Sequence, residues 1–143
     1  MRKITIITFG KIKSKPIEEL INYYLKLSSN KLDISHKELK DPGVRKISQD
    51  DINQTGFRIV LSEKGKEFDS INFAKYFQDK IDYQDELCFI LGNAFGVDQD
   101  LLDSADLVLS LSQFTMPHEL SLVVLMEQIY RATDINANGK YHK

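Results

Sequence analysis

The sequence is poor in the residues that build disulfide scaffolds, membrane spans and fibrous chains. Among 143 residues it has one cysteine, three prolines and seven glycines, and no tryptophan. A lone Cys88 excludes an internal disulfide, and its place in an apolar run favours a buried thiol over a nucleophile. No apolar run approaches the ~20 residues that a membrane-spanning helix needs. These absences predict one compact, soluble domain over residues 1–143.

The beginning of the sequence does not have the features of a signal peptide. Residues 1–9 start with basic residues, but the apolar stretch is short and no cleavage site of small residues follows it. This segment predicts a first strand, and the sequence as a whole predicts a cytoplasmic protein.

Charge is distributed unevenly along the chain. Residues 1–46 hold 11 Lys or Arg against 5 Asp or Glu, whereas residues 47–143 hold 8 against 16. Lys11, Lys13 and Lys15 concentrate part of the basic excess in one expected loop. Such a patch suits a polyanion such as RNA, although an ordinary solvated surface explains the charge equally well.

Short apolar or β-branched runs alternate with segments of helical period. This alternation predicts an α/β fold with a mostly parallel sheet and helices on both faces. Strands are expected over residues 3–9, 31–39, 57–61, 87–91 and 105–111, and helices from Pro16, over 70–81, from Asp98 and over 118–133. Residues 41–56 are expected to form a loop with at most one helical turn.

Three finer expectations concern packing. Gly65 is expected in a turn, and the helix over 70–81 is expected to bury Ile71, Ala74 and either Phe77 or Tyr76. The last helix carries a broad apolar stripe, formed by Leu122, Leu125, Met126 and Ile129. A stripe of this width predicts a homodimer built largely from that helix and its neighbours.

The common motifs of nucleotide, metal and hydrolytic sites are missing. There is no G-x-G-x-x-G, no phosphate-binding G-x-x-x-x-G-K-[ST] and no G-x-S-x-G. The three histidines are too scattered for a metal site, so none is expected. What remains is Gly92-x-x-x-Gly96 after the central strand, which either lets a ligand approach the backbone or simply turns the chain.

Two segments are the most informative: the run from Leu109 to His118, and the closing Tyr141-His142-Lys143. Further matching motifs are Ile4 to Lys13, Ile59 to Leu61, Gly65-Lys66, Gly92-x-x-x-Gly96 and Glu127 to Ala132. Together they resemble, over nearly the whole chain, the RlmH family. Its members are SPOUT-class methyltransferases that act on N3 of a pseudouridine in bacterial 23S ribosomal RNA.

The resemblance implies a homodimer, a C-terminal trefoil knot and S-adenosyl-L-methionine as cofactor. The assembled ribosome is the implied partner. The implied cofactor contacts are Leu61, Gly92, Leu111, Ser112, Gln113, Phe114, Thr115 and Met116. For Leu61 and Leu111, ordinary core packing is the alternative.

Methylating N3 requires that its proton be removed. His142 and His118 are the candidate bases, because imidazole titrates near neutral pH; a structural hydrogen bond is the alternative for each. Arg131 joins this catalytic set as a phosphate ligand, with a surface ion pair as the alternative. Tyr141 is expected to stack on a base, with a packed aromatic ring as the alternative. The loop that carries Lys11, Lys13 and Lys15, called the lysine loop below, is the expected rRNA-binding segment.

The sequence departs from the family pattern at three places. Asn93 stands where a second glycine is usual, Leu122 where an arginine is usual, and residues 41–56 are too few for the helix that most relatives insert. Two other functions stay open: an RNA-binding homologue without catalysis, and a flavodoxin-like protein with a small-molecule site. Cofactor binding and RNA binding discriminate among the three.

Overall fold

A single five-stranded sheet organises the chain. The computed structural model describes residues 1–143 and orders the strands β2-β1-β4-β3-β5, with every neighbouring pair parallel. The strands are β1 (Arg2–Phe9), β2 (Leu32–Leu39), β3 (Phe57–Glu67), β4 (Glu86–Ile90) and β5 (Leu107–Ser110). The expected parallel sheet with an apolar central strand is confirmed, since β4 lies in the middle and four of its five residues are buried.

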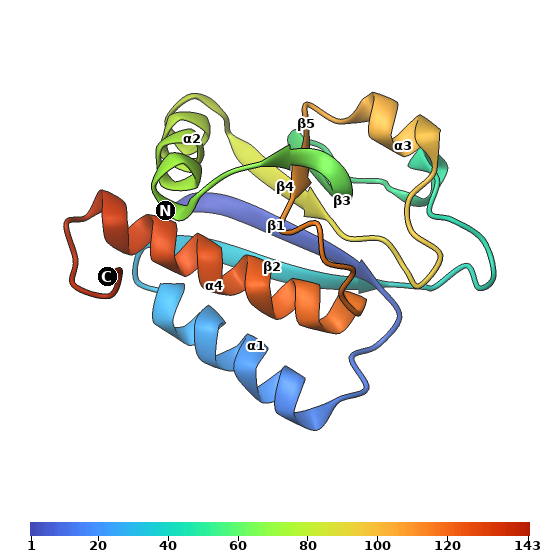
Figure 1. The fold of residues 1–143 in the computed structure, drawn as a ribbon, viewed down its shortest axis with the longest axis horizontal. Coiled ribbons are helices and arrows are strands. Elements are labelled where there is room, and N and C mark those ends of the chain that lie inside the picture. The colour runs from blue at the N-terminus through green and yellow to red at the C-terminus, as the bar shows by residue number, and fades with distance from the viewer.

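Four α-helices connect or follow these strands (Figure 1). They are α1 (Lys15–Ser28), α2 (Ser70–Tyr83), α3 (Gln99–Ser104) and α4 (His118–Asn136), with a 3-10 turn, η1 (Gln49–Asp51), in the 41–56 segment. Side chains just ahead of the helices start them: Ser14 and Asp69 accept hydrogen bonds from backbone N–H groups of α1 and α2. None of the helices has both the length and the apolarity needed to cross a membrane.

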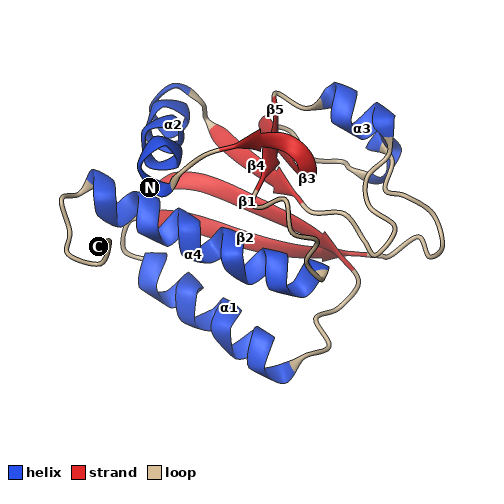
Figure 2. Ribbon diagram, in the orientation of Figure 1, coloured by secondary structure: helices blue, strands red, loops and turns tan.

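The two faces of the sheet are covered differently. The long helices α1, α2 and α4 pack on one face, where α4 contacts both of the others (Figure 2). A second, smaller core on the other face is covered by α3 and the segment around Ile47 and Ile52. Helices therefore lie on both faces, as expected, but one of the two is covered mostly by irregular chain.

The apolar stripe of α4 belongs to the core of this chain. Leu122, Leu125, Met126 and Ile129 are between 0% and 2% exposed and sit in the core formed with the sheet, α1 and α2. The stripe therefore gives no argument for a homodimer, which stays a prediction. The stripe is broad because α4 is covered on several sides by its own chain.

Two other expectations about packing are wrong. Helix α2 buries Phe73, Ala74, Phe77 and Ile81, whereas Ile71 is 42% exposed, because the helix turns its 73/77/81 side toward the core. Gly65 lies within β3, which continues to Glu67, and not in a turn. The pairing of β3 with β5 shifts register between Leu61 and Lys66, which is a bulge rather than an end of the strand.

Cys88 is inert, as expected. It lies in the central strand β4, its side chain is 1% exposed, and burial raises the pKa of its thiol to about 11. A thiol in this state supplies almost no thiolate near neutral pH.

The close approach of β5 explains Gly65 and gives a first prediction. A Cβ at this position would lie 2.6 Å from the carbonyl carbon of Val108. Gly65→Ala should therefore lower the free energy of unfolding by about 1–3 kcal/mol, as overpacking does elsewhere. Denaturant unfolding would measure the loss. Lys64→Ala, at an exposed position of the same strand, is the control, and equal stabilities of the two variants would contradict the prediction.

Candidate functional site

A cavity of about 690 Å³ opens at the ends of β4 and β5, beside the bulged part of β3. Three segments that are far apart in the sequence line it: residues 61–63 within β3, residues 91–97 after β4, and residues 109–118 from the end of β5 to the first residue of α4. Its volume falls in the range of roughly 300–1,000 Å³ that small-molecule sites occupy. The carboxyl ends of parallel strands are also where α/β folds bind their ligands.

Most of the implied cofactor contacts gather in this cavity. The lining includes Leu61, Gly92, Leu111, Ser112, Phe114, Thr115 and Met116, and His118 lies beside them. Gln113 does not line it: its amide nitrogen donates to Glu67 at 2.9 Å. Gln113 therefore supports the loop in this structure, and its contact with the cofactor stays a prediction.

The loop after β5 is braced by the bulged end of β3. Gln113 reaches Glu67, and the Thr115 hydroxyl lies 3.5 Å from a carboxylate oxygen of Glu63. Within the loop, the Ser112 hydroxyl accepts the backbone N–H of Phe114 at 2.9 Å. The continuation of β3 beyond Leu61 thus serves the site, because it provides the acceptors that hold the loop.

Gly92 is required by the loop itself. A Cβ on Gly92 would lie 2.9 Å from the carbonyl carbon of Gly96 and 3.0 Å from a methyl group of Val97. Gly96 has φ +87°, a backbone conformation that glycine adopts at little cost. Both glycines therefore make a tight turn, and the turn brings backbone to the cavity wall.

Several lining residues were not singled out from the sequence: Ser62, Glu63, Asn93, Phe95, Val97, Pro117 and Ser121. The rule that ligands bind at the carboxyl ends of parallel strands would have found Ser62 and Glu63, which directly follow Leu61. Phe95 could have been noticed as the aromatic residue between Gly92 and Gly96, and the structure leaves it 51% exposed.

The lysine loop lies beside the first turn of α4. The Glu119 carboxylate accepts the backbone N–H groups of Lys13 and Ser14 at 3.2 and 3.1 Å. The side chains of Lys11, Lys13 and Lys15 are exposed, and none of them forms an ion pair in the structure. The loop therefore presents three lysine side chains without ion pairs, and it is held at Glu119, the neighbour of His118 in the sequence.

The closing residues fold back on the other end of α4. The Tyr141 backbone N–H donates to Asp134 at 3.0 Å, and its ring packs edge-on against Tyr130 and lies over the Arg131 guanidinium. Burial raises the pKa of Tyr141 to about 12. Arg131 also pairs with Glu127 at 2.7 Å. The ion pair and the packed ring that were the alternatives for Arg131 and Tyr141 are both present.

The contact between Arg131 and His142 determines the tautomer of the histidine. Arg131 Nη1 lies 2.9 Å from His142 Nδ1, and a guanidinium can only donate. Nδ1 must therefore accept, so a neutral His142 carries its proton on Nε2. In this state His142 offers a hydrogen-bond donor and not a base.

The structure separates the predicted site residues into two groups. His118 and the cofactor loops lie at the start of α4, whereas Arg131 is about 20 Å further along the helix at ~1.5 Å per residue. Tyr141 and His142 lie beside Arg131, and Figure 1 shows the C-terminus at that end of α4. Within one chain, the C-terminal cluster does not reach the cavity.

The comparisons with known proteins agree with this geometry. The family described as "Predicted SPOUT methyltransferase" matches residues 2–142. The chain belongs to the SPOUT methyltransferase family. The resemblance to the RlmH family is confirmed, because relatives named ribosomal RNA large subunit methyltransferase H match nearly the whole chain.

Two such relatives share about a third of their residues with this SPOUT chain. "Ribosomal RNA large subunit methyltransferase H" of Pseudothermotoga lettingae is 34% identical, over 98% of this chain and 99% of its own. The protein of the same name from Prochlorococcus marinus is 35% identical, over 99% and 96%. A solved structure, of a probable methylase family protein from Haemophilus influenzae, has a TM-score of 0.60 at 8% identity and covers 96% of this chain and 67% of its own; it supports the fold alone.

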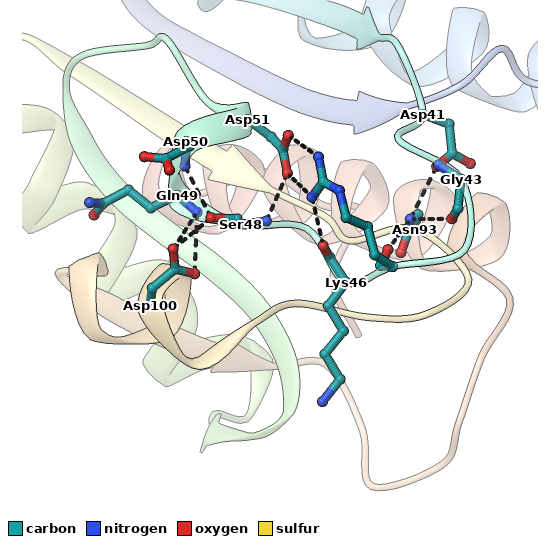
Figure 3. A network of polar contacts seen from close by, with 10 residues as sticks. Asp41, Gly43, Lys46, Ser48, Gln49, Asp50, Asp51, Asn93 and Asp100 are labelled. Carbon is teal, nitrogen blue, oxygen red and sulfur yellow. Dashed lines mark hydrogen bonds and ion pairs between the residues drawn. The ribbon is translucent and has the colours of Figure 1, made fainter.

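Residues 41–51 form a polar network with Asn93 and Asp100 (Figure 3). Arg45 forms two hydrogen bonds with Asp51, at 2.8 and 2.7 Å, and Asp100 accepts the Ser48 hydroxyl at 2.6 Å. A second cavity, of about 720 Å³, adjoins this segment and is lined by both charges, among them Lys37, Lys40, Asp41, Arg45 and Asp51.

The Arg45–Asp51 pair predicts a pH dependence of stability. The hydrogen bonds from Arg45 lower the pKa of Asp51 from 3.8 to about 2. A lowered pKa stabilises the fold above the unfolded value, and this contribution is lost as the pH falls toward 2. Arg45→Ala should therefore lower the melting temperature by about 1–4 °C near neutral pH, with the difference vanishing near pH 2. Thermal unfolding over a pH series measures it, and a constant difference would contradict it.

Proposed function

We propose that residues 1–143 form a single SPOUT domain that uses S-adenosyl-L-methionine to methylate N3 of a pseudouridine in 23S ribosomal RNA. The observation that carries the proposal is the cavity, which brings seven of the eight implied cofactor contacts from three separate segments to one place. The names of the relatives support the substrate class. The assembled ribosome is the proposed substrate, and the cytoplasm the proposed location.

The residues of the cavity suit this cofactor. Leu61, Leu91 and Leu111 give apolar walls for an adenine ring, and the turns after β4 and β5 bring backbone N–H and C=O groups to the wall. The trefoil knot that the family implies would involve the loop of residues 111–116. The proposal needs no metal, and no cluster of metal-ligating side chains is present in the structure.

When bound, S-adenosyl-L-methionine supplies an electrophilic methyl group. The task of the chain is to hold the target base in line and to accept the N3 proton. His118 is the proposed acceptor, because it lines the cavity and its ring takes part in none of the hydrogen bonds within the chain. His142, with its proton on Nε2, is proposed to donate a hydrogen bond to the base.

The distance between the cavity and the C-terminal cluster of Arg131, Tyr141 and His142 favours a homodimer with shared sites. The C-terminal cluster lies at the far end of α4 from its own cavity, so we propose that Tyr141 and His142 act at the cavity of a second copy. Arg131 holds His142 and stacks on Tyr141, and is thus proposed to position them. Lys11, Lys13 and Lys15 are proposed to bind ribosomal RNA phosphates, which makes ribosome binding salt-dependent.

Cofactor binding is the first test. Calorimetry should show that the protein binds S-adenosyl-L-methionine with micromolar affinity. Gly92→Val should abolish the heat, because its side chain would displace the turn at Gly96, whereas circular dichroism should show that the helices and the sheet persist. Absence of binding by the unaltered protein would favour the alternative, an RNA-binding homologue without catalysis.

Removal of residues 141–143 is the second test. The cofactor Kd should change by less than about twofold, because none of residues 141–143 lines the cavity and they are proposed to contact the target base, and single-turnover methyl transfer to ribosomes should fall by about 100-fold or more. Lys140→Ala, next to the deletion, is the control and should retain the rate. Equal rates of the truncated and full-length proteins would contradict a role for the C-terminal cluster.

Mixed dimers test where that cluster acts. A truncated subunit with an intact cavity, paired with a Gly92→Val subunit with an intact C-terminus, should regain part of the lost rate. Each variant alone should be inactive. Failure of the mixture to regain activity would place the action of the cluster within one chain and remove the argument for the shared site.

A further inference from the structure

Asn93 is a buried polar side chain in the wall of the cavity. It is 6% exposed, and it lies in the loop between β4 and α3 that lines the cavity from Leu91 to Val97. Its backbone φ is negative; among the non-glycine residues only Asn138 has a positive φ. The backbone at this position therefore accepts other residues, and the reason for asparagine must lie in its side chain.

That side chain joins two segments (Figure 3). Its amide nitrogen donates to the Asp41 carboxylate at 3.1 Å, to the Gly43 carbonyl at 3.3 Å and to the Arg45 carbonyl at 2.9 Å. Its oxygen accepts the backbone N–H of Phe95 at 3.0 Å. One amide thus bonds within the cavity loop, to Phe95, and also joins that loop to residues 41–45.

Backbone hydrogen bonds continue the same contact. Ile47 donates to the Gly96 carbonyl at 3.0 Å and accepts from Asp98 at 2.8 Å, and it is fully buried. The cavity loop therefore has few attachments of its own to the sheet beyond Leu91, which donates to Ile7. Its shape depends on the neighbouring 41–47 segment.

We propose that Asn93 is a positioning residue for the cofactor: it holds residues 92–97 in the shape that binds S-adenosyl-L-methionine by clamping them to residues 41–45. The inference rests on the proposed function for the identity of the ligand. It assigns a role to a side chain where the family pattern has glycine, and where a glycine would have no means of making these bonds.

The test is a set of substitutions at Asn93 with the KM for the cofactor and kcat measured separately. Asn93→Ala removes the clamp and leaves the Gly43 and Arg45 carbonyls without their donor, so the KM should rise at least about tenfold. At saturating cofactor, kcat should stay within about twofold of the unaltered protein, because bound cofactor restores the loop. A residue that only stabilises the fold would leave KM unchanged and reduce the active fraction.

A control and a rescue sharpen the test. Asn136→Ala removes a comparable bond, from the Asn136 amide to the Ala74 carbonyl at 3.0 Å, at the far end of α4, and should leave the KM within about twofold. Asn93→Asp turns the donor into an acceptor that faces three oxygens and should raise the KM further than alanine does. Adding Asp41→Asn, which supplies a donor across the contact, should recover part of that loss.

Amide exchange separates this inference from the proposed function. If the unaltered protein does not bind the cofactor, the proposed function fails, whereas the clamp is still judged without ligand. Exchange at the Phe95 and Ile47 amides should be at least about tenfold faster in Asn93→Ala and unchanged in Asn136→Ala. The clamp would be overturned if both amides exchanged in Asn93→Ala at the rates of the unaltered protein. A KM of Asn93→Ala no higher than that of Asn136→Ala would overturn it as well.

Discussion

All five strands run in the same direction, and this constraint determines where the chain can perform chemistry. Parallel pairing places the ends of β4 and β5 beside the bulged part of β3, so segments distant in the sequence line one cavity. Consecutive parallel strands must also be joined by crossing connections, of which α1 and α2 pack on one face together with α4, the helix that follows the last strand. Fold and site thus have the same origin.

The sequence predicted the elements well because their periods are strong. The structure has the expected element at each strong pattern: strands at the apolar runs of β1 and β4, and a helix, α1, at Pro16. Gly65 was assigned wrongly because a turn and a close approach of two backbones both select glycine. Ile71 was misplaced because the rotation of an amphipathic helix depends on what covers it. The stripe on α4 looks the same whether its own chain or a partner covers it.

The site was predicted less evenly, for a related reason. The segments that line the cavity match family motifs, and two of them follow strand ends, so most of their residues were found together. The contact between Arg131 and His142 and the bonds from Asn93 to residues 41–45 join positions that share no period. From the sequence, Asn93 was only a departure from the family pattern. Its amide has partners that exist only once the chain has folded.

The single thiol has a practical consequence for studying this molecule. Cys88 lies at the centre of β4, with its side chain 1% exposed and a pKa of about 11, so a thiol reagent reaches it only when that strand opens. The rate of its modification therefore reports the opening of the strand that leads directly into the glycine turn. Conversely, a cysteine introduced at the surface can be labelled selectively while the native thiol stays silent, which makes the chain suited to fluorescence or spin-label measurements without removing any natural residue.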